Sequence, residues 1–145
     1  MNIEATLEQI VAAVREEYGD RLLSVVLFGS QARGGADTFS DIDLLIIVTG
    51  LPSNWRERKK HLRSIKSRLA INGRLEIFLA DPEEIRSALA NASPLMFEIH
   101  DAHRLIYDPQ AFFAREMKKF AVNLKSWQAK KRAEGVWEVP GLAPR

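Results

Sequence analysis

Hydrophobic positions along the chain recur with two different periods, which predict an alternation of helices and strands. Apolar residues in segment 4–18 are spaced three and four apart, as on one face of a helix, whereas residues 22–28 form a Val- and Leu-rich run typical of a strand. Residues 41–48 predict a second strand, apolar on both faces beyond its first residues and therefore central in its sheet. Residues 54–71 predict a second helix, and residues 74–79 a third strand.

Capping residues followed by proline mark the second half of the chain. Asp81, Ser93 and Asp108 each precede a proline. This arrangement is typical of a helix start, because the capping oxygen can accept a hydrogen bond from a free backbone N–H. Between the last two caps, residues 104–107 predict a short edge strand. The alternation of helices and strands indicates an α/β or α+β domain built on a small sheet.

A long helix is predicted over residues 110–132, followed by an irregular tail after Gly135. The apolar side chains of this helix follow 4-3-4-3 spacing: Phe113, Met117, Phe120, Leu124 and Trp127. The stripe favours a core position, although it could also contact a partner or a second copy of the chain. We expect one domain over residues 1–108 and a C-terminal extension over residues 109–145. Trp137, in the tail, is the tryptophan that we most expect to face a partner.

The composition excludes several classes of site. The chain has no cysteine, so disulfides, thiolate catalysis and cysteine-ligated zinc are excluded. Its longest apolar run, residues 44–48, is far shorter than the about 20 residues that a membrane-spanning helix needs. The first residues lack the basic and apolar regions of a secretory signal, so we expect a cytoplasmic protein without a membrane partner.

The net charge of +2 hides an uneven distribution of charged residues. Residues 1–50 carry eight acidic and three basic side chains, whereas residues 51–80 carry eight basic and two acidic ones. This basic block could attract a triphosphate, a nucleic acid or an acidic protein surface. It could equally be a solvated helix face.

The strongest functional signal lies between the first two predicted strands. Gly29 and Ser30 follow the first strand, and ten residues separate them from Asp41 and Asp43 at the start of the second. A glycine turn can present backbone N–H groups to a phosphate. Because side chains alternate along a strand, the two aspartates project from the same face, with Cα atoms about 6.5–7 Å apart, and can share divalent metal.

Glu76 is the candidate for a third carboxylate. It lies in the predicted third strand between apolar neighbours, where a charged side chain is costly unless it is paired, bound to metal or exposed. Taken singly, each of these features has a simpler explanation, such as a capping aspartate or a polar residue on an open sheet face. Their combination at this spacing favours chemistry on a nucleoside triphosphate with two metal ions.

The segment GSQARGGADTFSDIDLLI resembles the nucleotidyltransferases of the DNA polymerase beta superfamily, whose signature is Gly-Ser, ten residues and Asp-x-Asp. It is most similar to the minimal nucleotidyltransferases that are found as antitoxin partners of HEPN proteins. The specific similarity covers residues 22–80. The resemblance implies a small mixed sheet flanked by helices, to which this chain adds a long C-terminal helix and tail.

The resemblance also implies roles for individual residues. Gly29 and Ser30 would contact the β- and γ-phosphates of ATP, and Asp41 and Asp43 would bind two Mg²⁺ ions. Glu76 would complete the metal site and help to deprotonate the acceptor, although many relatives have the shorter aspartate there.

Arg33 matches an arginine that is common in the minimal group. It could steady the phosphates, or it could pair with a nearby acid and brace the loop; we favour the second role.

The predicted reaction is attack of an acceptor hydroxyl on the α-phosphorus of a nucleotide, with release of pyrophosphate. The acceptor that the resemblance implies is a tyrosine of a HEPN-type toxin, which would make this protein an antitoxin. Two alternatives stay open. The protein could neutralise a partner by contact alone, or it could add nucleotides to RNA, DNA or a small-molecule hydroxyl.

Overall fold

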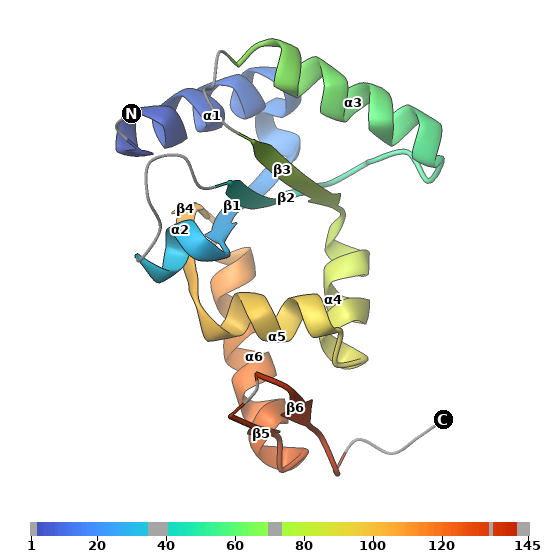
Figure 1. Ribbon diagram of the computed structural model, residues 1–145. Helices are drawn as coiled ribbons and strands as arrows, with labels where there is room; N and C mark the ends of the chain where they lie inside the picture. The colour runs from blue at the N-terminus through green and yellow to red at the C-terminus, as the bar shows by residue number, and fades with distance from the viewer. Residues whose placement is uncertain (1–2, 35–40, 70–73, 134, 142–145) are drawn as a thin grey trace.

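The computed structural model describes residues 3–34, 41–69, 74–133 and 135–141. In chain order (Figure 1), the elements are α1 (Ile3–Tyr18), a 3-10 turn (Gly19–Arg21), β1 (Leu22–Phe28), α2 (Ser30–Arg33), β2 (Ile42–Val48), α3 (Trp55–Ser67), β3 (Leu75–Ala80), α4 (Pro82–Ala90), α5 (Pro94–Asp101), β4 (His103–Tyr107), α6 (Phe112–Ser126), β5 (Lys130–Lys131) and β6 (Trp137–Glu138). None of the helices in the described ranges is long and apolar enough to span a membrane.

Four strands of the described chain form one mixed sheet in the order β3-β2-β1-β4. β1 runs antiparallel to both β2 and β4, whereas β2 and β3 are parallel. In each inner strand every residue but the second is buried, because both faces of the sheet are covered. The predicted α+β class, the central second strand and the short edge strand near residues 104–107 are confirmed.

Helices cover the two faces of the sheet separately, α1 and α3 above it and α4, α5 and α6 below it in Figure 1. On the first face, Leu7, Ile10 and Ile65 form one core with alternate residues of the inner strands. On the second face, Phe97 and Phe113 form another core with the strand residues in between. The strands therefore divide their side chains between two cores, as the alternation of a β-strand requires.

The C-terminal segment differs in part from the prediction. α6 ends at Ser126 and not near residue 132, because the chain turns at Gln128, whose φ of +57° is left-handed. Lys130–Lys131 then pairs antiparallel with Trp137–Glu138, so the tail after Gly135 is not irregular throughout. Strands of two residues carry no periodic pattern, which is why the sequence does not reveal them.

The apolar stripe of α6 belongs to the second core. Trp127 is partly buried, with its ring against Phe120. The other four residues of the stripe are buried: Phe113, Met117, Phe120 and Leu124. The predicted core position is therefore confirmed, and this stripe is not available to a second copy of the chain. An oligomer through the C-terminal helix and a domain boundary at residue 108 stay predictions.

Two of the three predicted caps make side-chain hydrogen bonds. At α4 the Glu84 N–H donates to the Asp81 carboxylate over 2.8 Å, and the Asp81 N–H donates back to the Glu84 carboxylate over 3.1 Å. At α6 the Phe113 N–H donates to Asp108 over 3.2 Å, while Ser24 in β1 donates its hydroxyl to the same carboxylate over 2.7 Å. Ser93 makes no such bond at α5.

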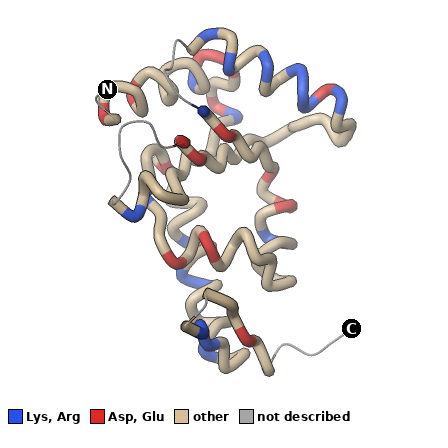
Figure 2. The backbone as a smooth tube through the Cα atoms, viewed as in Figure 1, with Lys and Arg blue, Asp and Glu red and all other residues tan. Residues whose placement is uncertain are grey.

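The basic block divides into structural and exposed residues. Arg58 in α3 has a side chain that is only 6% exposed, and it lies 2.7 Å from the Glu84 carboxylate and 3.8 Å from that of Asp81. It also donates to the Pro52 carbonyl over 2.6 Å. Basic residues recur along α3 (Figure 2). Five of them in this helix are exposed: Arg56, Lys59, Lys60, Arg63 and Lys66. The solvated helix face is therefore present, whereas attraction of a triphosphate, a nucleic acid or an acidic protein surface stays a prediction.

Arg58→Ala should lower the free energy of unfolding by about 2 kcal/mol, because it removes a buried cation and leaves two half-buried carboxylates without their partner. Urea unfolding followed by circular dichroism measures this change. The exposed Arg56 provides the matched control, since Arg56→Ala should change the stability by less than about 0.5 kcal/mol. Equal losses for the two variants would show that the Arg58 pairs contribute nothing specific.

Candidate active site

The turn after β1 brings the backbone into direct contact with an acid of β2. Gly29 has φ +74° and ψ −153°, a conformation that is essentially restricted to glycine. Its carbonyl accepts hydrogen bonds from the N–H groups of Ala32 and Arg33, each over 3.2 Å, and so closes the turn. A Cβ atom at position 29 would lie 2.3 Å from the Asp43 carboxylate oxygen Oδ2. The turn and the acid therefore meet only because residue 29 is glycine.

The register of the sheet aligns the candidate acids. Phe28 is paired with Asp43, and Asp43 is paired with Glu76 on the other side. Residues paired across a sheet project from the same face. Because Phe28 belongs to the second core, Asp43 and Glu76 lie on the face that α4, α5 and α6 cover. Asp41 precedes Asp43 by two residues and, if the alternation extends to it, faces the same way.

Arg74 lies between two of the three carboxylates. Its Nε is 3.8 Å from Asp41 Oδ2, and its Nη2 donates to Glu76 Oε1 over 3.2 Å. Within the described residues, no group of three His, Asp or Glu side chains is arranged to hold a metal ion. Asp41 and Asp43 offer the hard oxygen donors that Mg²⁺ prefers, whereas Glu76 could join them only after Arg74 releases it. A three-carboxylate metal site stays a prediction.

The electrostatic environment of Asp43 favours a cation. Burial raises the pKa of the Asp43 carboxyl, and the negative charges of Asp41, Glu98 and Glu76 raise it further, while Arg33 lowers it. The acids thus repel one another. A bound cation would relieve this repulsion, so the residues at this position suit a metal ion.

Glu98 in α5 is a fourth acid at the site that sequence reasoning missed. It lies 3.7 Å from the Arg33 guanidinium, and both side chains are about half exposed. Of the two roles open to Arg33, pairing with a nearby acid is the one present in the structure, and a phosphate contact stays a prediction. The only sequence signal for Glu98 is its place between two buried residues of a helix, which predicts a side chain on the outer surface.

Ser30 begins α2 and is half-buried beside Gly29. Residues 35–40, which complete the sequence motif, lie outside the described residues. The arrangement as described joins a turn that requires glycine to the acids Asp43 and Glu76 on one face of the sheet. A phosphate placed on the turn would lie next to the carboxylate of Asp43.

Gly29→Ala should lower the free energy of unfolding by about 2 kcal/mol or more, because the added Cβ meets the Asp43 carboxylate and the backbone conformation is strained for alanine. Gly34→Ala is the matched control. Gly34 also has a positive φ, +77°, but open space surrounds its Cβ position, so the loss should be only about 1 kcal/mol. Similar losses in thermal unfolding would argue against a close approach of Gly29 to Asp43.

Asp43→Asn should raise the free energy of unfolding at pH 7 in a chelated, metal-free buffer. The folded protein holds the Asp43 proton more tightly than the unfolded chain does, so ionisation above the ordinary pKa of 3.8 costs stability. The gain should shrink as the pH falls and vanish below about pH 3, where both states are protonated. Urea titrations across this range measure it, with Asp20→Asn as the exposed control. A gain that persists in acid would contradict this cause.

A family model described as "Nucleotidyltransferase domain" matches residues 7–127, from α1 to the end of α6. The Methanocaldococcus jannaschii protein "Putative protein adenylyltransferase MJ1305" is 31% identical over 121 residues, which are 82% of this chain and 81% of that protein. A second protein of this organism, with the same name but designated MJ0604, is 43% identical over 47 residues, 32% of this chain and 47% of that protein.

Solved structures share the fold at low sequence identity. A spectinomycin adenyltransferase AAD(9) from Enterococcus faecialis, with ATP and spectinomycin, has a TM-score of 0.57 and 12% identity, over 83% of this chain and 65% of that chain. A chain of the tri-AMPylated Shewanella oneidensis HEPN toxin in complex with MNT antitoxin has a TM-score of 0.50 and 14% identity, over 86% and 92%. These likenesses confirm the predicted fold.

The resemblance that the motif indicated is thus confirmed over most of the chain, well beyond residues 22–80. The family match includes the turn at Gly29 and the acids at Asp41, Asp43 and Glu76. Together with the relative that is 31% identical, it leads to one conclusion: this chain belongs to the nucleotidyltransferase domain family and catalyses nucleotidyl transfer.

Proposed function

We propose that this protein is a magnesium-dependent adenylyltransferase that transfers AMP from ATP to a hydroxyl group of another protein. The observation that carries the proposal is the contact between the Gly29 turn and Asp43, with Asp41 and Glu76 beside it. Such a site can hold a triphosphate and its metal ions at one edge of the sheet. The 31% identical relative, named for protein adenylyltransfer and matched over most of both chains, supports the donor and the class of acceptor.

The residues of the site divide the work between binding and proton transfer. Gly29 and Ser30 bind the β- and γ-phosphates through the turn. Asp41 and Asp43 hold two Mg²⁺ ions, which when bound neutralise the charge that develops on the phosphates and lower the pKa of the acceptor hydroxyl. Glu76, once Arg74 releases it, completes this set.

The reaction forms one bond and breaks one bond at the α-phosphorus. The acceptor oxygen attacks opposite the bridging oxygen of pyrophosphate, and pyrophosphate leaves with the electron pair of the broken bond. The proton of the acceptor hydroxyl passes to a carboxylate oxygen of Glu76. No sulfur nucleophile is available, because the chain has no cysteine.

The proposed acceptor is a tyrosine hydroxyl of a HEPN-type toxin, and the transfer would silence that toxin. Support comes from the fold shared with a chain of the complex between a tri-AMPylated HEPN toxin and an MNT antitoxin. The exposed basic residues of α3 lie on the opposite side of the sheet from the acids, so they form no nucleic-acid-binding surface next to the reacting phosphate. For this reason we place nucleotide addition to RNA or DNA last among the candidate functions.

One observation favours a contact-only role as the second candidate. Arg74 neutralises Asp41 and Glu76 in this structure, and an arginine that stayed there would leave the acids unable to hold two metal ions. The protein could then neutralise its partner by binding alone.

The double variant Asp41→Asn, Asp43→Asn should lower transfer of label from α-labelled ATP to protein by at least about 100-fold, because both metal-binding oxygens lose their charge. The assay uses extract of the source organism as the supply of acceptor, followed by gel autoradiography. Asp20→Asn, an exposed acid in the turn before β1, should label normally.

Undiminished labelling by the double variant would show that Asp41 and Asp43 do not hold the metal ions. Loss of labelling together with full neutralisation of the partner would instead support the contact-only role.

A further inference from the structure

The C-terminal hairpin is a folded part of the molecule. Its strands pair Lys131 with Trp137, and the Arg132 N–H donates to the Val136 carbonyl over 2.7 Å. Its far end is tied to α6, because the Gly141 N–H donates to the Trp127 carbonyl over 2.7 Å. These backbone bonds hold the hairpin at a defined place beside the helices.

Two contacts join the hairpin to α5. The Trp137 ring lies against Phe97, with ring centroids 4.8 Å apart and planes tilted by 31°. The Lys131 ammonium forms an ion pair with the Asp101 carboxylate. Phe97 is buried in the second core, so Trp137 rests on a rigid support, while Trp137 itself stays partly exposed.

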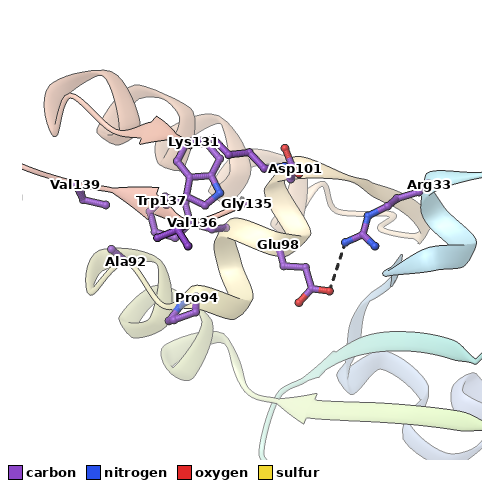
Figure 3. Close-up of a pocket in the computed structure, with 11 residues that line it drawn as sticks. Arg33, Ala92, Pro94, Glu98, Asp101, Lys131, Gly135, Val136, Trp137 and Val139 are labelled. Carbon is purple, nitrogen blue, oxygen red and sulfur yellow. Dashed lines mark hydrogen bonds and ion pairs between the residues drawn. The ribbon is translucent and has the colours of Figure 1, made fainter. Parts of the chain in front are cut away.

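A cavity of about 540 Å³ lies between α5 and the hairpin (Figure 3). Its apolar lining includes Pro94, Phe97, Val136, Trp137 and Val139. Its charged lining consists of Arg33, Glu98, Asp101 and Lys131, which form two ion pairs. A volume in this range, apolar walls and a few polar groups are typical of small-molecule sites.

The cavity opens beside the acids of the active site. Arg33 and Glu98 line it, and they form the ion pair that links α2 to α5 (Figure 3). Arg33 ends the short helix that begins at the Gly29 turn, and the charge of Glu98 reaches Asp43. A molecule whose phosphates bind at the turn can therefore extend past this ion pair into the cavity.

We propose that this cavity binds the base of the nucleoside triphosphate donor. The proposal rests on the proposed function, since it extends the same site from the phosphates to the nucleoside. The two ion pairs leave the lining without net charge, so the cavity suits an uncharged ring better than a phosphate. The partly exposed Trp137 offers an aromatic surface for stacking. The carboxylates of Glu98 and Asp101 can accept hydrogen bonds from a ring amino group, such as that of adenine.

Trp137→Ala tests the assignment when ATP is compared with inorganic tripolyphosphate, which has no base. Calorimetry with Mg²⁺ present should show ATP binding about tenfold more weakly to the variant, within the range of one aromatic stacking contact. Tripolyphosphate should bind the variant and the unmodified protein equally. Equal ATP affinity in the two proteins would overturn the proposal.

Two further variants separate stacking from damage to the hairpin. Trp55→Ala removes a tryptophan that is 66% exposed on α3, far from the hairpin in the fold, and should leave ATP affinity unchanged. In the double variant Trp55→Phe, Trp127→Phe, the fluorescence reports Trp137 alone, and ATP should quench it while tripolyphosphate does not. This readout requires no change at Trp137, so it tests the proposal even if Trp137→Ala fails to fold.

The outcomes distinguish the base site from the proposed function. If neither ATP nor tripolyphosphate binds the unmodified protein, the donor assignment fails and the base site fails with it. If both bind and Trp137→Ala weakens neither, only the base site is wrong. If Trp137→Ala keeps ATP affinity but loses labelling of protein, the cavity belongs to the acceptor and the proposal is overturned.

Discussion

The close approach of the Gly29 backbone to the Asp43 carboxylate is the constraint on which the site depends. It requires the register between β1 and β2 that pairs Phe28 with Asp43. A slip of one residue would turn Asp43 to the other face of the sheet, away from the second core. The two cores prevent such a slip, because it would exchange every buried side chain of β2 between them. Hydrophobic packing therefore fixes the geometry of a polar site.

The same packing holds several carboxylates of like charge close together. The register of the sheet holds Asp43 and Glu76 on one face, and the negative charges of Asp41 and of Glu98 in α5 also act on Asp43. Two arginines form ion pairs with these acids, Arg33 and Arg74, and their side chains are 53% and 75% exposed. Exposed pairs of this kind contribute little energy, so a divalent cation could displace them at low cost.

The sequence predicted the inner strands and the motif because both are local signals. The two inner strands are apolar at every position but one, Ser24 in β1 and Asp43 in β2, and the Gly29 turn has a backbone conformation that is essentially restricted to glycine. The end of α6 was predicted wrongly, because side-chain periodicity says nothing about the backbone turn at Gln128. The hairpin and Glu98 could not be predicted, since each gains its position only when distant elements pack together.

The carboxylate of Asp108 joins two parts of the molecule that the chain separates widely. It accepts a hydrogen bond from Ser24 in the middle of β1 and from backbone N–H groups at the start of α6. β1 leads into the Gly29 turn, and the C-terminal hairpin follows the other end of α6. The connection between β4 and α6 therefore acts as a spacer of fixed length. In a homologue with an insertion there, the Gly29 turn and the hairpin would shift relative to each other without any substitution at the acids.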